Sequence, residues 1–256
     1  MIGRWLLGGL TLLGVALAFP VAALARGGGV GGGRRGRFPG EALQRLGFSA
    51  SQIQVAAWAW DEACALSPVP DEPLILLAIA ARETGFRPDV RSAAGLRDDE
   101  FGGSFTMYQI GAPSLRSRPG GLDAVSVAGP DDVERAVREQ TRAALDFIKA
   151  NNLRARAERD GKGSAEPGAY ACGEYATVWG FGGSKSLAWV LEQPRSVRAG
   201  GRLPSQRDAQ IIMTTWDQQK AAGVPEEQRI IGTGLAGILH KVQVYRALVS
   251  GAEGIA

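Results

Sequence analysis

Histidine and cysteine are scarce in this chain, which has one histidine and two cysteines among 256 residues. Zinc, haem and iron–sulfur centres each need several such ligands, so the composition predicts neither a metal site nor a cofactor. A Ser-His-Asp or Cys-His arrangement would have to use His240, which lies in a helical, largely apolar stretch and is more typical of an ordinary helix residue. The chemistry is therefore expected from other side chains.

An excess of charge of one sign is also missing. The 29 Lys and Arg residues face 26 Asp and Glu residues, which leaves a net charge of +3. This is too small to argue for nucleic acid, and we expect no nucleic-acid partner. Strand signals are rare too, with residues 104–110 as the best short candidate. Hydrophobic residues make up 45% of the chain, enough for a sizeable core.

The first 25 residues have the pattern of a secretory signal. A basic residue precedes an apolar run over 5–19, and small residues follow it and end in Ala-Leu-Ala at Ala25. We expect cleavage after Ala25 and export to the periplasm or cell envelope. The alternative is an uncleaved membrane anchor through residues 5–24, because the apolar stretch approaches spanning length and the arginines of 34–37 favour the cytoplasmic side.

Residues 26–40 are rich in glycine and arginine, and they predict a flexible linker between the signal and a folded domain. The remainder, 41–256, predicts a single domain, with packed chain expected from about Phe38. No internal repeat divides it.

The domain is predicted to be mainly α. Ser49 with Gln52 three residues later is a capping-box signal for a helix start. Asp71 followed by Pro73 opens a second helix, which ends at Glu83 with Gly85 just beyond it. The other predicted helices begin at Asp131, at Ser205 and near Leu235, and the predicted loops cover 116–130, 154–168 and 193–204.

Glu83 is the leading candidate for catalysis. It ends the most apolar helix of the sequence, where both desolvation and the negative end of the helix dipole disfavour an ionised carboxylate. Both effects favour a proton donor near neutral pH, which general acid catalysis requires. The alternative is that Glu83 points into solvent at a frayed helix end, as most charged residues do.

Three segments, in order along the chain, carry a resemblance to a known family. Residues 83–88, Glu-Thr-Gly-Phe-Arg-Pro, resemble the E-S-x-F-x-P segment of lysozyme-like lytic transglycosylases. Residues 104–109, Ser-Phe-Thr-Met-Tyr-Gln, are similar to their S-x-G-L-M-Q segment, although Thr106 stands at the usual glycine. Residues 169–173, Ala-Tyr-Ala-Cys-Gly, resemble their A-Y-N-x-G motif, with Ala171 in place of the asparagine.

The resemblance implies a lysozyme-like α-rich domain in which a short β and loop region lines a cleft for a glycan strand. It implies cleavage of the β-1,4 bond between N-acetylmuramic acid and N-acetylglucosamine in peptidoglycan, giving 1,6-anhydromuramic ends. Glu83 would be the catalytic acid and base. The substrate-binding residues that it implies are Thr84, Ser104, Met107, Tyr108, Gln109 and Tyr170, with Met107 and Tyr108 as walls against sugar faces and Tyr170 beside Glu83.

Two alternative functions remain open on the sequence. A hydrolytic muramidase on the same fold would need a second carboxylate to orient water, and Asp98, Asp99 and Glu100 are its candidates. A catalytically inactive, exported glycan-binding module is the other, favoured by the departures at Thr106 and Ala171.

The two cysteines predict a disulfide. Cys64 and Cys172 both follow the signal segment, and an exported chain enters an oxidising compartment in which pairs form and persist. The alternative is two buried thiols.

Overall fold

The structure, a computed structural model, describes residues 36–90, 103–181, 185–193 and 200–253. All of them belong to one unit, 33–256, and the signal or anchor prediction for 1–25 lies outside the described residues. The prediction of a mainly α fold is confirmed. Among the helices described here, none combines the length and hydrophobicity needed to cross a bilayer.

The elements follow one another along the chain as follows. The longer helices are α2 (Ala50–Leu66), α3 (Glu72–Glu83), α6 (Val133–Ala150), α8 (Pro167–Phe181), α10 (Gln206–Ala221) and α11 (Thr233–Glu253). The shorter ones are α1 (Gly40–Arg45), α4 (Ala112–Arg116), α5 (Gly121–Val125), α7 (Leu153–Asp160) and α9 (Leu187–Glu192), with 3₁₀ turns at Pro130–Asp132 and Glu226–Gln228. The two strands, β1 (Ser104–Phe105) and β2 (Ile110–Gly111), form an antiparallel hairpin in which Ser104 pairs with Gly111.

Local sequence signals explain where α2 and α3 begin. Ser49 caps α2, because its side chain accepts from the backbone N–H of Gln52 while the Gln52 side chain accepts from the backbone N–H of Ser49. Pro73 lies in the first turn of α3, where its missing N–H has no intrahelical acceptor to lose. Both predicted starts are confirmed.

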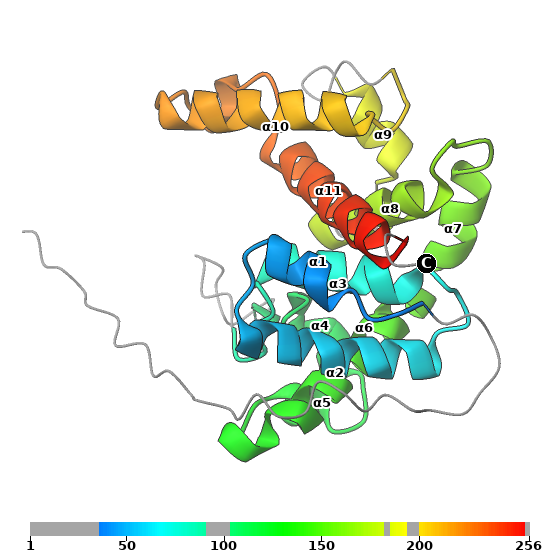
Figure 1. Ribbon diagram of the computed structural model, residues 1–256, viewed down its shortest axis with the longest axis vertical. Coiled ribbons are helices and arrows are strands. Elements are labelled where there is room, and N and C mark those ends of the chain that lie inside the picture. The colour runs from blue at the N-terminus through cyan, green and yellow to red at the C-terminus, as the bar shows by residue number, and fades with distance from the viewer. Residues whose placement is uncertain (1–35, 91–102, 182–184, 194–199, 254–256) are drawn as a thin grey trace, which may run out of the picture. The chain divides into compact units, whose positions relative to one another are not determined.

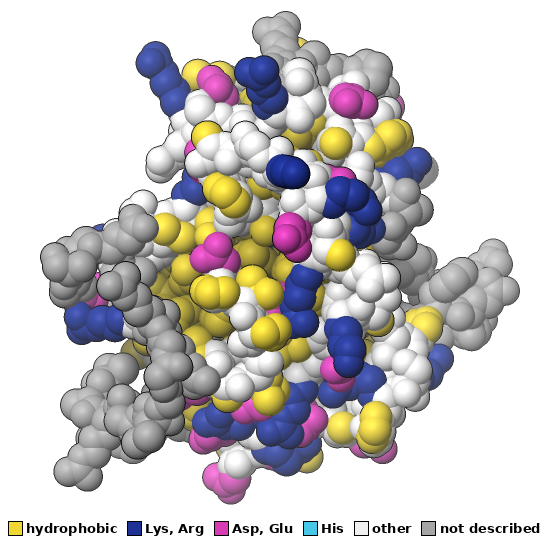
Figure 2. All heavy atoms as spheres, turned by 90° about the vertical axis from the view of Figure 1, so that its right-hand side faces the viewer, with side chains coloured by type: hydrophobic (Ala, Val, Ile, Leu, Met, Phe, Trp, Pro, Cys, Tyr) yellow, Lys and Arg dark blue, Asp and Glu magenta, His cyan; other side chains and the backbone are white. Residues whose placement is uncertain are grey.

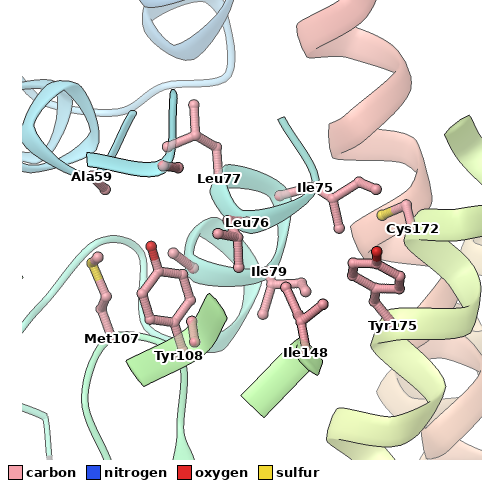
Figure 3. Packing of buried hydrophobic residues seen from close by; sticks show 14 of the residues in the cluster. Ala59, Ile75, Leu76, Leu77, Ile79, Met107, Tyr108, Ile148, Cys172 and Tyr175 are labelled. Atoms are coloured by element: carbon pink, nitrogen blue, oxygen red, sulfur yellow. The ribbon is translucent and has the colours of Figure 1, made fainter. Parts of the chain in front are cut away.

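Helix α3 is the centre of the fold. It packs against α2 on one side and against α8 and α11 on the other, as Figure 1 shows. Figure 3 shows Leu76 and Ile79 of α3 in the middle of the core, with Met107 and Tyr108 on one side and Cys172 and Tyr175 on the other. The residues from Ile75 to Ala80 are at most 1% exposed. This burial explains why the helix is apolar on nearly every face.

The packed chain begins close to the predicted boundary. The ring of Phe38 lies 6.2 Å from that of Trp60, and Pro39 is buried. Helix α1 packs on the last helix through Gly251, where any Cβ atom would lie only 2.5 Å from the Cβ of Ala42. The last residues assigned to the linker are therefore part of the core.

Two of the predicted loops contain helices, and the first is 116–130, which contains α5. Residues 154–168 were expected to be irregular, but α7 occupies the first part of this range. Leu153 and Ala157 are the only buried residues of α7, and arginines fill much of the rest. The Arg154 guanidinium donates to both carboxylate oxygens of the buried Glu72, at 2.6 and 2.8 Å. Residues distant in sequence hold α7 in place, so the residue pattern within 154–168 did not predict a helix.

The structure does not contain the predicted disulfide between Cys64 and Cys172. Both residues carry thiols, half-buried for Cys64 and fully buried for Cys172. Cys64 lies near the end of α2 and Cys172 lies in α8, and Figure 3 shows α3 between the Cys172 side and Ala59 of α2. Helix α3 lies between the helices that contain Cys64 and Cys172, which explains why the predicted disulfide is not formed.

We expect the purified full chain to contain two thiols. Alkylation with iodoacetamide in denaturant, without reductant, should add two groups by mass. In the native protein Cys172 should resist alkylation, because burial raises the pKa of its thiol to about 12 and blocks access. If the denatured chain is alkylated only after reduction, the two cysteines form a disulfide and this prediction is wrong.

Candidate functional site

Glu83 ends α3 at a sharp change of chain direction. The N–H of Thr84 donates to the Ala80 carbonyl and that of Gly85 to the Ala81 carbonyl. Gly85 has φ +63°, a conformation that costs little only for glycine, and it ends the helix as the sequence predicted. The Glu83 side chain is 26% exposed, so a carboxylate emerges at the surface from the most buried helix.

A lysine that the sequence analysis missed contacts this carboxylate. The Lys241 ammonium lies 2.5 Å from Glu83 Oε1, and the lysine side chain is only 6% exposed. This ion pair joins α11 to the end of α3. The signal available in the sequence was a lysine in the largely apolar stretch of the last helix.

The turn after Glu83 is tied to the hairpin. The buried Thr84 hydroxyl donates to the Met107 carbonyl at 3.0 Å. Met107 lies in the hairpin turn, which belongs to the second of the three segments that carry the family resemblance. Residues 23 positions apart are thereby fixed side by side.

The helix that carries the third segment, α8, meets the same turn near its C-terminal end. Trp179, on the helix that carries the Ala-Tyr motif, donates its indole N–H to the Tyr108 carbonyl at 2.8 Å. Its ring also packs against Phe147, with the centroids 4.6 Å apart. Thr84 of the first segment and Trp179, which follows the third segment on the same helix, therefore donate to consecutive carbonyls of the second.

The hairpin turn is held in an unusual backbone conformation. Thr106 has φ +74° and Gln109 has φ +54°, and Phe86 beside Glu83 has φ +60°. These are three of the four non-glycine residues with positive φ in the described part of the chain, the other being Asn152. Such strain, of order 1–3 kcal/mol each, persists only where the surroundings impose it and often marks functional sites.

Gln140 is the group that imposes much of this arrangement. It is fully buried on α6, and its carbonyl oxygen accepts from the Met107 N–H at 2.9 Å. Its amide donates to the carbonyls of Pro88 and Val125, each at 2.8 Å. Gln140 thus joins the segment after Glu83, the hairpin and α5, and a buried amide on an apolar helix face was its only signal in the sequence.

The predicted sugar-facing walls are wrong. Met107 and Tyr108 are both 0% exposed, and the Tyr108 hydroxyl lies 3.1 Å from the Thr141 hydroxyl inside the core. Neither side chain presents a face to solvent, because the strained turn directs them inward onto α3 (Figure 3). They support the hairpin from beneath instead.

Gln109 and Ser104 remain half-buried on the hairpin. The Gln109 amide donates to the Thr106 carbonyl at 3.0 Å and to the Val90 carbonyl at 3.4 Å. This amide links the hairpin to the chain that leaves the Glu83 turn. Residues 91–102, with Asp98, Asp99 and Glu100, lie outside the described residues.

Tyr170 is not beside Glu83, contrary to the prediction. A Cβ atom on nearby Gly168 would lie 2.8 Å from Asp71 Oδ2, so this end of α8 lies against the start of α3. Glu83 is at the other end of α3, about 18 Å away at the rise of an α-helix. Burial and the charges of Glu174 and Asp160 raise the pKa of Tyr170.

A shallow hollow of about 330 Å³ lies at this far end, lined by the start of α8 and by Tyr245 and Arg246 of α11. On the face shown in Figure 2, hydrophobic side chains gather around a hollow, with acidic and basic side chains interspersed around it. That face therefore carries no broad patch of one charge sign.

Within the ranges described, no three acidic, histidine or cysteine side chains lie close enough together to hold a metal ion. Comparisons with known protein families, with curated proteins and with solved structures give no match for this chain. The geometry of the Glu83 region therefore carries the functional argument.

Proposed function

We propose that the protein cleaves the β-1,4 bond between N-acetylmuramic acid and N-acetylglucosamine in peptidoglycan, on a lysozyme-like α-rich domain. The observation that carries the proposal is that the first two segments meet at one hairpin turn, to which the helix that carries the third segment also bonds. Thr84, next to Glu83, and Trp179, on the Ala-Tyr helix, donate to the neighbouring carbonyls of Met107 and Tyr108.

In the proposed reaction, Glu83 donates a proton to the glycosidic oxygen as the bond to C1 of the muramic acid breaks. The bonding electron pair goes to that oxygen, and the acetamido group of the same sugar assists at C1. The sugar's own 6-hydroxyl then bonds to C1, and Glu83 takes its proton, which closes the 1,6-anhydro ring. One carboxylate suffices for both steps.

The product distinguishes the two cleavage reactions. We expect the full chain, incubated with purified peptidoglycan, to release fragments that end in 1,6-anhydromuramic acid, identified by mass spectrometry. Each such fragment is lighter by one water than the hydrolysis product. Reducing-end muramic acid, together with loss of activity on substitution of Asp98, Asp99 or Glu100, would instead show a hydrolytic muramidase. No release of fragments at all would contradict both.

A catalytically inactive glycan-binding module is the second candidate. Two observations favour it: the Lys241 ammonium neutralises Glu83, and the two residues expected as sugar-facing walls are buried. Sedimentation of the full chain with insoluble peptidoglycan, without any release of fragments over the same period, would support this candidate over the enzyme.

A further inference from the structure

We propose that Gln52 is a positioning residue for the reaction assigned to Glu83, because it fixes the turn that follows this glutamate from the start of α2. The side-chain amide of Gln52 donates to the Gly85 carbonyl at 2.8 Å, across 33 positions of the sequence. This inference rests on the proposed function and adds to it a residue that acts through the backbone beside Glu83.

The two ends of the Gln52 side chain have different partners. Its oxygen accepts from the backbone N–H and from the hydroxyl of Ser49, each at 2.9 Å, which completes the capping box of α2. Its nitrogen takes no part in that cap and donates to Gly85 instead. Glutamate completes a capping box as well as glutamine does. The cap alone therefore does not require an amide at this position, whereas the bond to Gly85 does.

The turn that Gln52 holds is strained. Gly85 has φ +63° and Phe86 has φ +60°, and for a phenylalanine this left-handed conformation is unfavourable. The Phe86 ring is 1% exposed and packs edge-on against the ring of Phe48, with the centroids 5.0 Å apart. The segment 48–52 therefore holds both left-handed residues of the turn, one by its ring and the other by its carbonyl.

The Glu83 carboxylate and the hairpin both depend on the direction of this turn. Glu83 lies two positions before Gly85, and Thr84 between them donates to the Met107 carbonyl in the hairpin turn. The buried apolar residues of α3 keep that helix in place without the bond to Gly85. Without this bond, the chain after Glu83 can relax towards a less strained conformation while α3 stays folded. The acid and the hairpin then shift relative to each other, and a displacement of about 1 Å lowers a rate by about 10²-fold.

Gln52→Glu tests the inference because it retains the capping box and replaces the donor with a carboxylate oxygen that faces the Gly85 carbonyl. The full chain is assayed for kcat and KM of fragment release from sonicated, soluble peptidoglycan, and its melting temperature is measured by circular dichroism. We expect kcat to fall about 10- to 100-fold, because the acid is misaligned. KM should stay within about twofold, because no group that binds substrate is removed. The melting temperature should stay within about 4 °C of that of the parent, because the cap of α2 is intact.

Two control variants separate positioning from stability. Ser49→Ala removes the hydroxyl that accepts from the Gln52 backbone N–H and leaves the Gln52 amide able to donate to Gly85. Loss of this cap should lower the melting temperature by about 2–8 °C while kcat stays within about twofold. Gln44→Glu makes the same exchange at an exposed glutamine of α1 and should change neither quantity measurably.

The outcomes distinguish this inference from the proposed function. If the parent chain cleaves peptidoglycan and folded Gln52→Glu keeps the kcat of the parent, Gln52 only caps α2, and the proposed function stands. If the parent releases no fragments, both proposals fail. If Gln52→Glu is unfolded at the assay temperature, Gln52→Ala replaces it, because the Ser49 hydroxyl still caps α2 there while the donor to Gly85 is absent. The same fall in kcat is expected for that variant, and a kcat equal to that of the parent would again overturn the role of Gln52.

Discussion

The Glu83→Gln variant of the full chain is expected to release fragments from purified peptidoglycan about 10²–10⁴ times more slowly than the parent, or more slowly still. Glutamine keeps the size of the side chain and can accept a hydrogen bond from Lys241. It can neither donate a proton to the glycosidic oxygen nor recover one from the 6-hydroxyl. Because one carboxyl group performs both steps in the proposed reaction, its loss is not compensated elsewhere.

Folding has to be measured on the same variant. From the sequence alone, removing a disfavoured carboxyl should leave stability unchanged or slightly improved. The structure overturns that expectation, because the variant leaves the buried Lys241 ammonium facing a neutral amide. We expect the free energy of unfolding to fall by about 1–3 kcal/mol, measured by urea titration. Activity is therefore assayed in the absence of denaturant and well below the melting temperature.

Glu158→Gln is the matched control for this variant. Glu158 is an exposed glutamate on α7, and its substitution should change neither rate nor stability measurably. Fragment release by Glu83→Gln at the rate of the parent would show that Glu83 is not the acid, and the proposed function would fail.

The second large effect is expected at Gln140. Its substitution by methionine keeps a similar volume but removes three hydrogen bonds, to the Met107 N–H and to the carbonyls of Pro88 and Val125. Each buried group left without a partner costs about 1–3 kcal/mol. We expect the free energy of unfolding to fall by about 3–5 kcal/mol in urea titration.

Gln218 provides the comparison for Gln140. It is exposed on α10, and Gln218→Met should change the free energy of unfolding by no more than about 0.5 kcal/mol. Gln140→Met should also lower peptidoglycan cleavage by more than its loss of stability explains, because the hairpin and the turn after Glu83 lose their common anchor. A Gln140→Met variant as stable as the parent would contradict this description of the region.

Much of the helical framework was predictable because its signals are local. The Ser49 and Gln52 capping pair, Pro73 near the start of α3 and Gly85 beyond its end are short-range devices, and each lies where it was expected. The uninterrupted apolar run of α3 also predicted its place in the core, because a helix without a polar face can be stable only when covered on all sides.

The details of the candidate site were less predictable, because they depend on which way the hairpin turn faces. Positive φ at Thr106 and Gln109 turns Met107 and Tyr108 into the core, although their residue types suited sugar-facing walls equally well. Residue type alone does not distinguish an aromatic side chain in a core from one in a binding cleft.

The sequence by itself determined the α-rich class, the approximate starts of five of the six longer helices, with α8 as the exception, and the position of Glu83 at the end of the most apolar one. Only the tertiary structure decided that Lys241 contacts Glu83, that Tyr170 lies at the other end of α3, and that α3 stands between the helices of Cys64 and Cys172. The reason is physical: capping and amphipathic patterns act within a few residues, whereas these arrangements depend on how α8 and α11 pack on α3, far from it in the sequence. Their geometry is set by how whole helices pack on α3, and no local pattern records it.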